Sequence, residues 1–240
     1  MDVTRSFKYV FEDKDWIKKV LIGGVLNLVP VIGQAFMWGY GLRQLKNVKE
    51  GRELPLPEWD DWGGDLMRGI MIFLGYLVYA IPLIILSIFS GIFTGLGTTA
   101  TLNAARAGQA SGTGIWGVCI CGISIINFIY SIALAVWLPA ALLNYINVGS
   151  FMGFFKFADI LALIKNNLKD YITVVLMWLA ATIVAGIVGG IVCGVGTLFT
   201  LFIANLVFVH LLGQFGASIS GSPFGGAPTT PADATFTMPQ

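Results

Sequence analysis

Very few side chains in this sequence are of the types that carry out chemistry. The chain has one histidine, His210, and three cysteines, at positions 119, 121 and 193. An imidazole acts as an acid or base only with a partner in hydrogen-bond reach, and the apolar sequence around His210 has no carboxylate. We interpret His210 as a helix-contact residue. The cysteines lack the partner spacing of a zinc site and are interpreted as packing residues.

The composition indicates that lipid, and not water, surrounds most of the chain. Of 240 residues, 56% are hydrophobic and only 11% are charged, and the mean hydropathy is +0.81. Soluble domains carry roughly 25% charged residues, so the sequence predicts an all-α polytopic membrane protein. A net charge of +1 offers no excess of cations for nucleic acid. Without paired ionisable groups, we expect a non-enzymatic protein with no catalytic residue, cofactor or metal.

Two long stretches carry almost no charge. Between residues 69 and 155 only Arg106 is charged, and residues 171–232 carry no charge. A helix crosses the roughly 30 Å hydrocarbon layer in about 20 residues, so each stretch has room for two passes. The sequence therefore predicts a transmembrane bundle of four full helices over residues 69–215.

The turns of this bundle are expected at small residues. The first stretch divides at the small, polar run of residues 95–114, which gives spans near 69–94 and 117–143. The second stretch turns back in the glycine-dense segment 186–196.

Residues 20–45 form an earlier apolar stretch that is interrupted by Asn27, Pro30 and Gln34. A single tilted span would divide the 14 Lys and Arg residues 6 against 8 across the membrane. A re-entrant or short helical hairpin, with two arms of about a dozen residues, would place 13 of the 14 inside and only Arg106 outside. Cytoplasmic loops are rich in Lys and Arg. This favours the hairpin, with both termini cytoplasmic, and a single span remains the alternative.

Interfacial and polar segments complete the predicted domains. Residues 1–19 and 150–168 have the pattern of amphipathic helices that lie in the membrane surface, and 46–68 is a cytoplasmic loop. In the tail 216–240, 15 of 25 residues are Gly, Pro, Ser or Thr, which predicts disorder.

Aromatic side chains concentrate at headgroup depth, and the expected interfacial anchors are Trp16, Trp59, Trp62 and Tyr171.

Four cations are candidates for lipid binding. Arg43, Lys46, Lys49 and Arg52 are spaced by three residues, so a helix would align them along one cytoplasmic face. Such a stripe could hold anionic headgroups, each cation contributing around 1 kcal/mol. The simpler interpretation is that these cations only fix the topology.

Asn27 and Gln34 are the candidates for an intramembrane polar site, because both flank Pro30 at the apex of the predicted hairpin. Polar groups at membrane depth often mark a substrate path. The simpler interpretation is that they hold helices together by hydrogen bonds.

Several short motifs carry a family resemblance. They are the loop Pro55-Leu56-Pro57-Glu58-Trp59, the preceding Gly39-Tyr40-Gly41, the later Asn144-Tyr145 and the phenylalanine-rich segment after it. Over roughly residues 1–215 the chain resembles an uncharacterised archaeal and bacterial integral-membrane family, domain of unknown function 4013. The resemblance implies a prokaryotic cell-membrane protein and transfers no catalytic residue.

Two classes of function follow from these patterns. The first is a membrane-organising or scaffold protein whose partners are membrane lipids, some of them anionic, and further copies bound through glycine-rich faces such as Gly186-x3-Gly190. The alternative is a small transporter or a scramblase-like lipid-handling protein. Because the spans carry no charge to coordinate a charged solute, only neutral or amphiphilic substrates fit this alternative.

Overall fold

The computed structural model is mainly helical in the residues that it describes, which are 2–108, 113–191 and 194–219. These residues form eight α-helices and one 3-10 helix, and no strand occurs among them. The elements are α1 (Val3–Glu12), α2 (Trp16–Leu26), α3 (Ile32–Lys49), α4 (Trp62–Arg106), α5 (Thr113–Val148), η1 (Phe151–Phe155), α6 (Phe157–Asn166), α7 (Leu168–Ile191) and α8 (Gly196–Ile219). Helices α4, α5, α7 and α8 are long and apolar enough to cross a membrane. The predicted all-α membrane fold is confirmed.

The chain divides into two compact units. Unit 1 combines Met1–Leu74 with Pro139–Gln240, and unit 2 is Gly75–Leu138. Helices α4 and α5 each place one end in unit 1 and the rest in unit 2.

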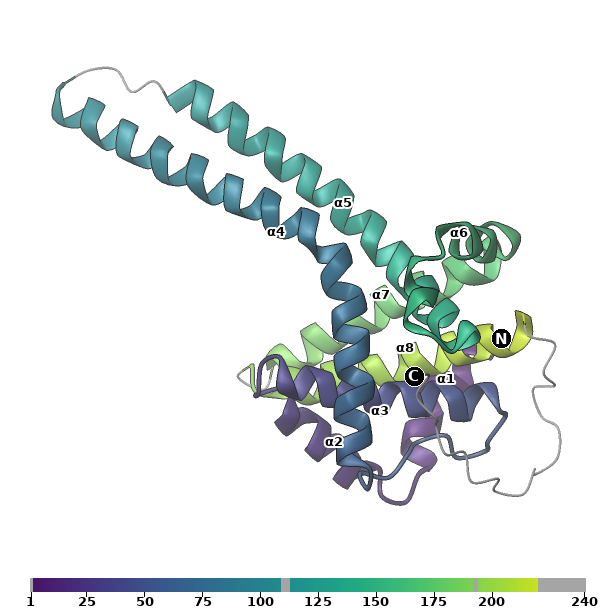
Figure 1. Cartoon of the computed structure of the whole chain (residues 1–240). Coiled ribbons are helices and arrows are strands. Elements are labelled where there is room, and N and C mark those ends of the chain that lie inside the picture. Colours follow the sequence, from purple (N-terminus) through teal and green to yellow (C-terminus); the bar gives the residue numbers. More distant parts are fainter. Residues whose placement is uncertain (1, 109–112, 192–193, 220–240) are drawn as a thin grey trace. The chain divides into compact units, whose positions relative to one another are not determined.

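Helix α8 is the central element of unit 1. Helices α1, α2, α3 and α7 all pack on it, and Figure 1 shows α8 between α7 and α3. Its sequence is mainly apolar, and its buried polar side chains His210 and Gln214 bond to α1. Phe202 and Leu206 of α8 form a core with Tyr9, Met37 and Tyr40.

Helices α2 and α3 lie where the sequence predicts the N-terminal hairpin, and its place in the membrane stays a prediction. Helix α2 ends at Leu26, with Asn27 as its C-cap, and Pro30 then removes a backbone donor. Val31 follows with φ +66° and ψ −63°, and the Ile32 amide donates to the Pro30 carbonyl at 2.8 Å, which is the geometry of the rare, strained γ-turn. Helix α3 has 18 residues and is longer than the arm expected from the sequence.

The turn between α7 and α8 lies at the end of the glycine-dense segment, where Gly194 has φ +77°. Helices α7 and α8 approach most closely at Gly189, where an added Cβ would lie 2.3 Å from Cα of Thr197. Ala181 and Ala185 are buried on the same face. Gly186 and Gly190, by contrast, face open space. The small-residue face that packs on α8 is therefore offset by one residue from the Gly186-x3-Gly190 pattern.

Unit 2 contains the C-terminal part of α4 and the N-terminal part of α5, which run antiparallel. The Tyr130 hydroxyl donates to the Tyr79 carbonyl at 3.0 Å, and the rings of Phe93 and Trp116 lie 6.1 Å apart. Helix α4 continues to Arg106, although the sequence predicts a non-helical run from residue 95. Packing explains the difference, because Trp116 lies directly against Gly97 and stabilises the helix there.

Two other predicted segments differ in detail. Residues 150–168 contain η1 and α6, separated at Lys156, and not one continuous helix. Phe154 is buried within unit 1, whereas Phe157 is exposed. Residues 216–219 of the predicted tail are the end of α8, and the rest of the tail lies outside the described residues.

Candidate functional site

The loop between α3 and α4 is held by charged side chains from three directions. The Arg43 guanidinium donates to both carboxylate oxygens of Asp65, at 2.8 and 2.6 Å, and to Asp60 at 2.8 Å. Arg68 donates to the same Asp65 at 2.8 Å and pairs with Asp61. Asp65 is fully buried, so these two cations balance a charge that has lost its water.

Lys19 of α2 joins this loop from the other side. Its buried amine lies 2.8 Å from an Asp13 oxygen and 2.6 Å from a Glu58 oxygen. Burial alone would lower the pKa of Lys19, but hydrogen bonds to the two carboxylates outweigh burial and raise it. We call the eight charged residues that meet here the ion network: Asp13, Lys19, Arg43, Glu58, Asp60, Asp61, Asp65 and Arg68.

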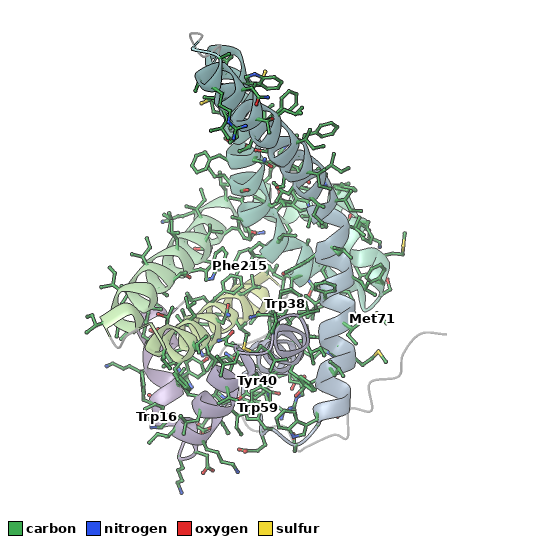
Figure 2. The ribbon with its side chains drawn as sticks, turned by 90° about the vertical axis from the view of Figure 1, so that its left-hand side faces the viewer. Trp16, Trp38, Tyr40, Trp59, Met71 and Phe215 are labelled. Carbon is green, nitrogen blue, oxygen red and sulfur yellow. The ribbon has the colours of Figure 1, made fainter. Side chains whose placement is uncertain are left out.

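Aromatic rings and prolines complete the attachment of the loop. The Trp59 ring stacks on Tyr40 at 4.2 Å, and its indole N–H donates to the Lys19 carbonyl at 3.2 Å; Figure 2 shows Trp59 and Tyr40 together. The Tyr40 hydroxyl donates to the Pro57 carbonyl at 2.8 Å, and Asn47 donates to the Pro55 carbonyl at 3.0 Å. The Pro-Glu-Trp loop is therefore a fixed part of unit 1.

Two glycines allow the start of α4 to reach α3. A Cβ on Gly39 would lie 1.8 Å from the Asp65 carbonyl oxygen, and a Cβ on Gly69 would lie 1.7 Å from the Ala35 carbonyl oxygen. The two backbones are thus in direct contact, which places Asp65 between Arg43 and Arg68.

Two exposed carboxylates of the network have pKa values below the ordinary Asp value. A hydrogen bond from Arg43 lowers the pKa of Asp60, and a hydrogen bond from Arg68 lowers the pKa of Asp61.

A second buried polar cluster joins α1 to α8. Gln214 accepts from the Asp2 amide at 2.7 Å and donates to the Asp2 carbonyl at 3.1 Å, which fixes the orientation of its side-chain amide. The same NH₂ group lies 3.0 Å from Nδ1 of His210. It also donates to the Ser6 hydroxyl at 3.1 Å. Ser6 completes the cluster, 2.9 Å from Nδ1.

The structure separates the four cations predicted to bind lipid headgroups. Arg43 belongs to the ion network, and Arg52 pairs with Glu50 at 3.0 Å. Lys49 donates to the Asn147 side chain at 2.6 Å, and Lys46 is partly buried near Arg68, with its pKa lowered by burial and by that positive charge. Lipid binding by these residues stays a prediction.

The structure brings Asn27 and Gln34 together. Gln34 donates to the Asn27 side-chain oxygen at 3.0 Å, and Asn27 donates to the Leu198 carbonyl at 2.6 Å. The two amides therefore connect the hairpin tip to the start of α8.

The four predicted aromatic anchors lie in different surroundings. Trp62 is exposed, Trp16 is half-buried, and Trp59 is half-buried against Tyr40. Tyr171 is fully buried, and its hydroxyl accepts from the Ala140 amide at 3.0 Å, next to Pro139, which interrupts the helix ladder. Its ring has no surface left for a headgroup.

Sequence reasoning missed most of the partners in both clusters. Asp65 and Arg68 are three residues apart on a helix, a spacing that typically indicates an ion pair. No local pattern relates Ser6 to His210, because 204 residues separate them.

The fold and these clusters define an all-α membrane protein. Its charged loop is held against the helices by ion pairs and hydrogen bonds. The chain belongs to the family described as a protein of unknown function, DUF4013, which matches residues 22–194. It is also 29% identical over 141 residues to the uncharacterized protein MJ1189 of Methanocaldococcus jannaschii. That match covers 58% of this chain and 44% of the relative, so the chain spans less than half of that protein. No solved structure matches the chain.

Proposed function

We propose that the protein is a non-enzymatic scaffold of the prokaryotic cell membrane, with both termini on the cytoplasmic side. The observation that carries this proposal is the ion network. Its charges pair with one another and fasten α2, α3, the loop and the start of α4 into one arrangement. Charges that hold chain segments together in this way serve rigidity, which a scaffold needs.

Reconstitution tests this proposal directly. Purified protein in lipid vesicles is expected to give no lipid scrambling and no solute flux above protein-free vesicles. Energy transfer between labelled copies should exceed the level for randomly distributed molecules, because a scaffold self-associates; Gly186 and Gly190 offer an open small-residue surface for this contact. Scrambling that increases with protein density would contradict the proposal.

The alternative is a small transporter or lipid-handling protein for neutral or amphiphilic substrates. The hydrogen-bonded chain of Gln34, Asn27 and the Leu198 carbonyl supports this alternative, because it places polar groups at an otherwise apolar tip. Replacing both amides by leucine separates the two functions. If they only join helices, stability falls by about 1 kcal/mol and vesicle behaviour is unchanged. If they line a path, flux or scrambling is lost while stability is kept. Asn166→Leu, at an exposed position of α6, is the matched control.

Anionic lipids are the proposed partners of Arg43, Lys46, Lys49 and Arg52. The side chains of Lys46 and Lys49 are only partly buried. We expect K46Q/K49Q to reduce the thermal stabilisation that anionic lipid gives to the detergent-solubilised protein, with K165Q, at an exposed site on α6, as the control. Equal stabilisation of all three proteins would exclude these lysines as lipid contacts.

A further inference from the structure

The outer face of α7 is an apolar surface that runs the full length of the helix. No charged residue occurs between Tyr171 and Ile191. Large apolar side chains are exposed at every turn, namely Ile172, Leu176, Leu179, Ile183, Val184, Ile187, Val188 and Ile191. The opposite face of α7 packs on α8.

The ion network lies against a different side of α8. The Trp59 ring is 6.3 Å from the ring of Phe202. Phe202 is six residues after Gly196, the first residue of α8, which is about 9 Å along the helix axis. The neighbouring carboxylates face solvent, with Glu58 56% and Asp60 69% exposed.

Helix α1 continues this charged side along the rest of α8. Asp2 bonds to Gln214, Ser6 to His210, and Tyr9 to the Leu206 carbonyl, so α1 runs antiparallel to α8. Lys8 and Glu12 of α1 are exposed. Exposed charges therefore accompany α8 from the level of Phe202 to the level of Gln214.

An upright α8 cannot accommodate this charged side. The hydrocarbon layer is about 30 Å thick, and α8 is about 36 Å long. The level of Phe202, next to Trp59 and its neighbouring carboxylates, would therefore lie inside the layer, where charged side chains are costly. Among the residues that the structure describes, α1, α2 and α3 make no extensive contact with α7. Water on the charged side and hydrocarbon on the α7 side satisfy both faces at once.

We propose that the α7–α8 hairpin lies lengthwise in one membrane interface, with the outer face of α7 as its lipid-docking surface and the ion network in water. Both helices qualify as candidate spans by length and composition. These two properties do not fix the orientation of the helices relative to the membrane plane. Interfacial helices bury their apolar face about 5–10 Å deep. The proposal concerns lipid contact alone and holds for a scaffold and for a lipid-handling protein.

Depth measurements along α7 test this proposal. Spin labels are attached, one at a time, to cysteines at Ile172, Ile183 and Ile191, in a protein whose native cysteines are replaced, and their depths are measured in bilayers. All three side chains are exposed, so the labels displace no packing. A lengthwise helix predicts three depths within about 5 Å of one another. An upright helix predicts that Ile183 lies about 15 Å deeper than both ends, and that result overturns the proposal.

Helix α5 provides the matched control. Val118, Phe128 and Val136 are exposed positions along its unit 2 segment, in which no charged residue occurs. Labels at these positions should show a deep middle and shallow ends. A flat profile in α7 beside a deep-centred profile in α5 supports the proposal. In α7, Val184 and Val188 are also exposed. They serve as alternative labelling positions if one of the first cysteine variants does not fold.

Discussion

Units 1 and 2 are both rich in apolar residues, but their polar side chains have different kinds of hydrogen-bond partners. In unit 1, side chains distant in sequence bond to one another, as Arg43 does with Asp65 and Ser6 with His210. In unit 2, serine and threonine hydroxyls donate back to their own helix, as Thr98 does to the Thr94 carbonyl and Ser131 to the Asn127 carbonyl; the Tyr130 hydroxyl bonds across to Tyr79. Unit 1 is therefore fixed by specific pairs, whereas unit 2 is fixed mainly by helix formation and by its apolar surroundings.

The largest expected difference concerns glycines. Gly39→Ala would put a methyl group into the Asp65 backbone, so we expect loss of folded protein. Gly91→Ala in unit 2 meets open space and should raise helix stability by up to about 1 kcal/mol. Thermal unfolding in detergent measures both. A Gly39→Ala protein that melts like the wild type would contradict the close α3–α4 contact.

The next largest effect is expected at Asp65. Asp65→Asn leaves Arg43 and Arg68 without their buried counter-charge, which typically costs about 3–5 kcal/mol. The control is Asp159→Asn, because Asp159 is exposed and lies 3.9 Å from Lys156; it should cost less than about 1 kcal/mol. Denaturant unfolding compares the two variants. Equal losses would show that the network contributes no more than a surface pair.

Serine substitutions sharpen the comparison at a smaller scale. Ser6→Ala removes a hydroxyl that bonds to His210, Gln214 and the Asp2 carbonyl and is expected to cost at least about 1 kcal/mol. Ser131→Ala removes only a bond within its own helix, so its effect should stay within about 0.5 kcal/mol. The free energies of unfolding of the two variants decide the matter, and a larger loss for Ser131→Ala would reverse the comparison.

The smallest change in stability is expected when the pH is lowered. The lowered pKa values of Asp60 and Asp61 mean that their ion pairs contribute fully above the ordinary Asp value of 3.8 and are lost as pH falls through the lower folded values. Because both side chains are largely exposed, the loss should be below about 1 kcal/mol. Melting curves at decreasing pH check this, and D60N/D61N should show a weaker dependence. An equal dependence would assign acid sensitivity to other groups.

Much of the fold could be predicted because membrane solvation leaves a strong signal. The long uncharged stretches predicted the apolar helices, and Pro30 with its neighbours predicted the hairpin break. The continuation of α4 beyond Gly95 could not be predicted, because glycine lowers helix propensity only by about 1 kcal/mol and the contact of Gly97 with Trp116 is tertiary.

The candidate site was harder to predict than the fold. Arg43 was recognised as a cation, but its partner Asp65 is 22 residues away, and Lys19 meets Glu58 across 39 positions of sequence. Only the packing of α2 and α3 brings these groups together. The offset between Gly186 and the packed Gly189 has the same origin, since the composition of a helix does not state which of its faces meets a neighbour.

The central claim is that the two units contact lipid differently. Its most direct test is to determine from which side of the membrane the α7–α8 turn can be labelled. Single cysteines at Val195, Asp60 and Arg106, all exposed positions, are labelled with an impermeant maleimide in intact cells and in inverted vesicles. The account predicts that Val195→Cys reacts from the same side as Asp60→Cys, and that Arg106→Cys reacts from the opposite side. Reaction of Val195→Cys from the side of Arg106→Cys would show that α7 and α8 cross the membrane and would contradict the account.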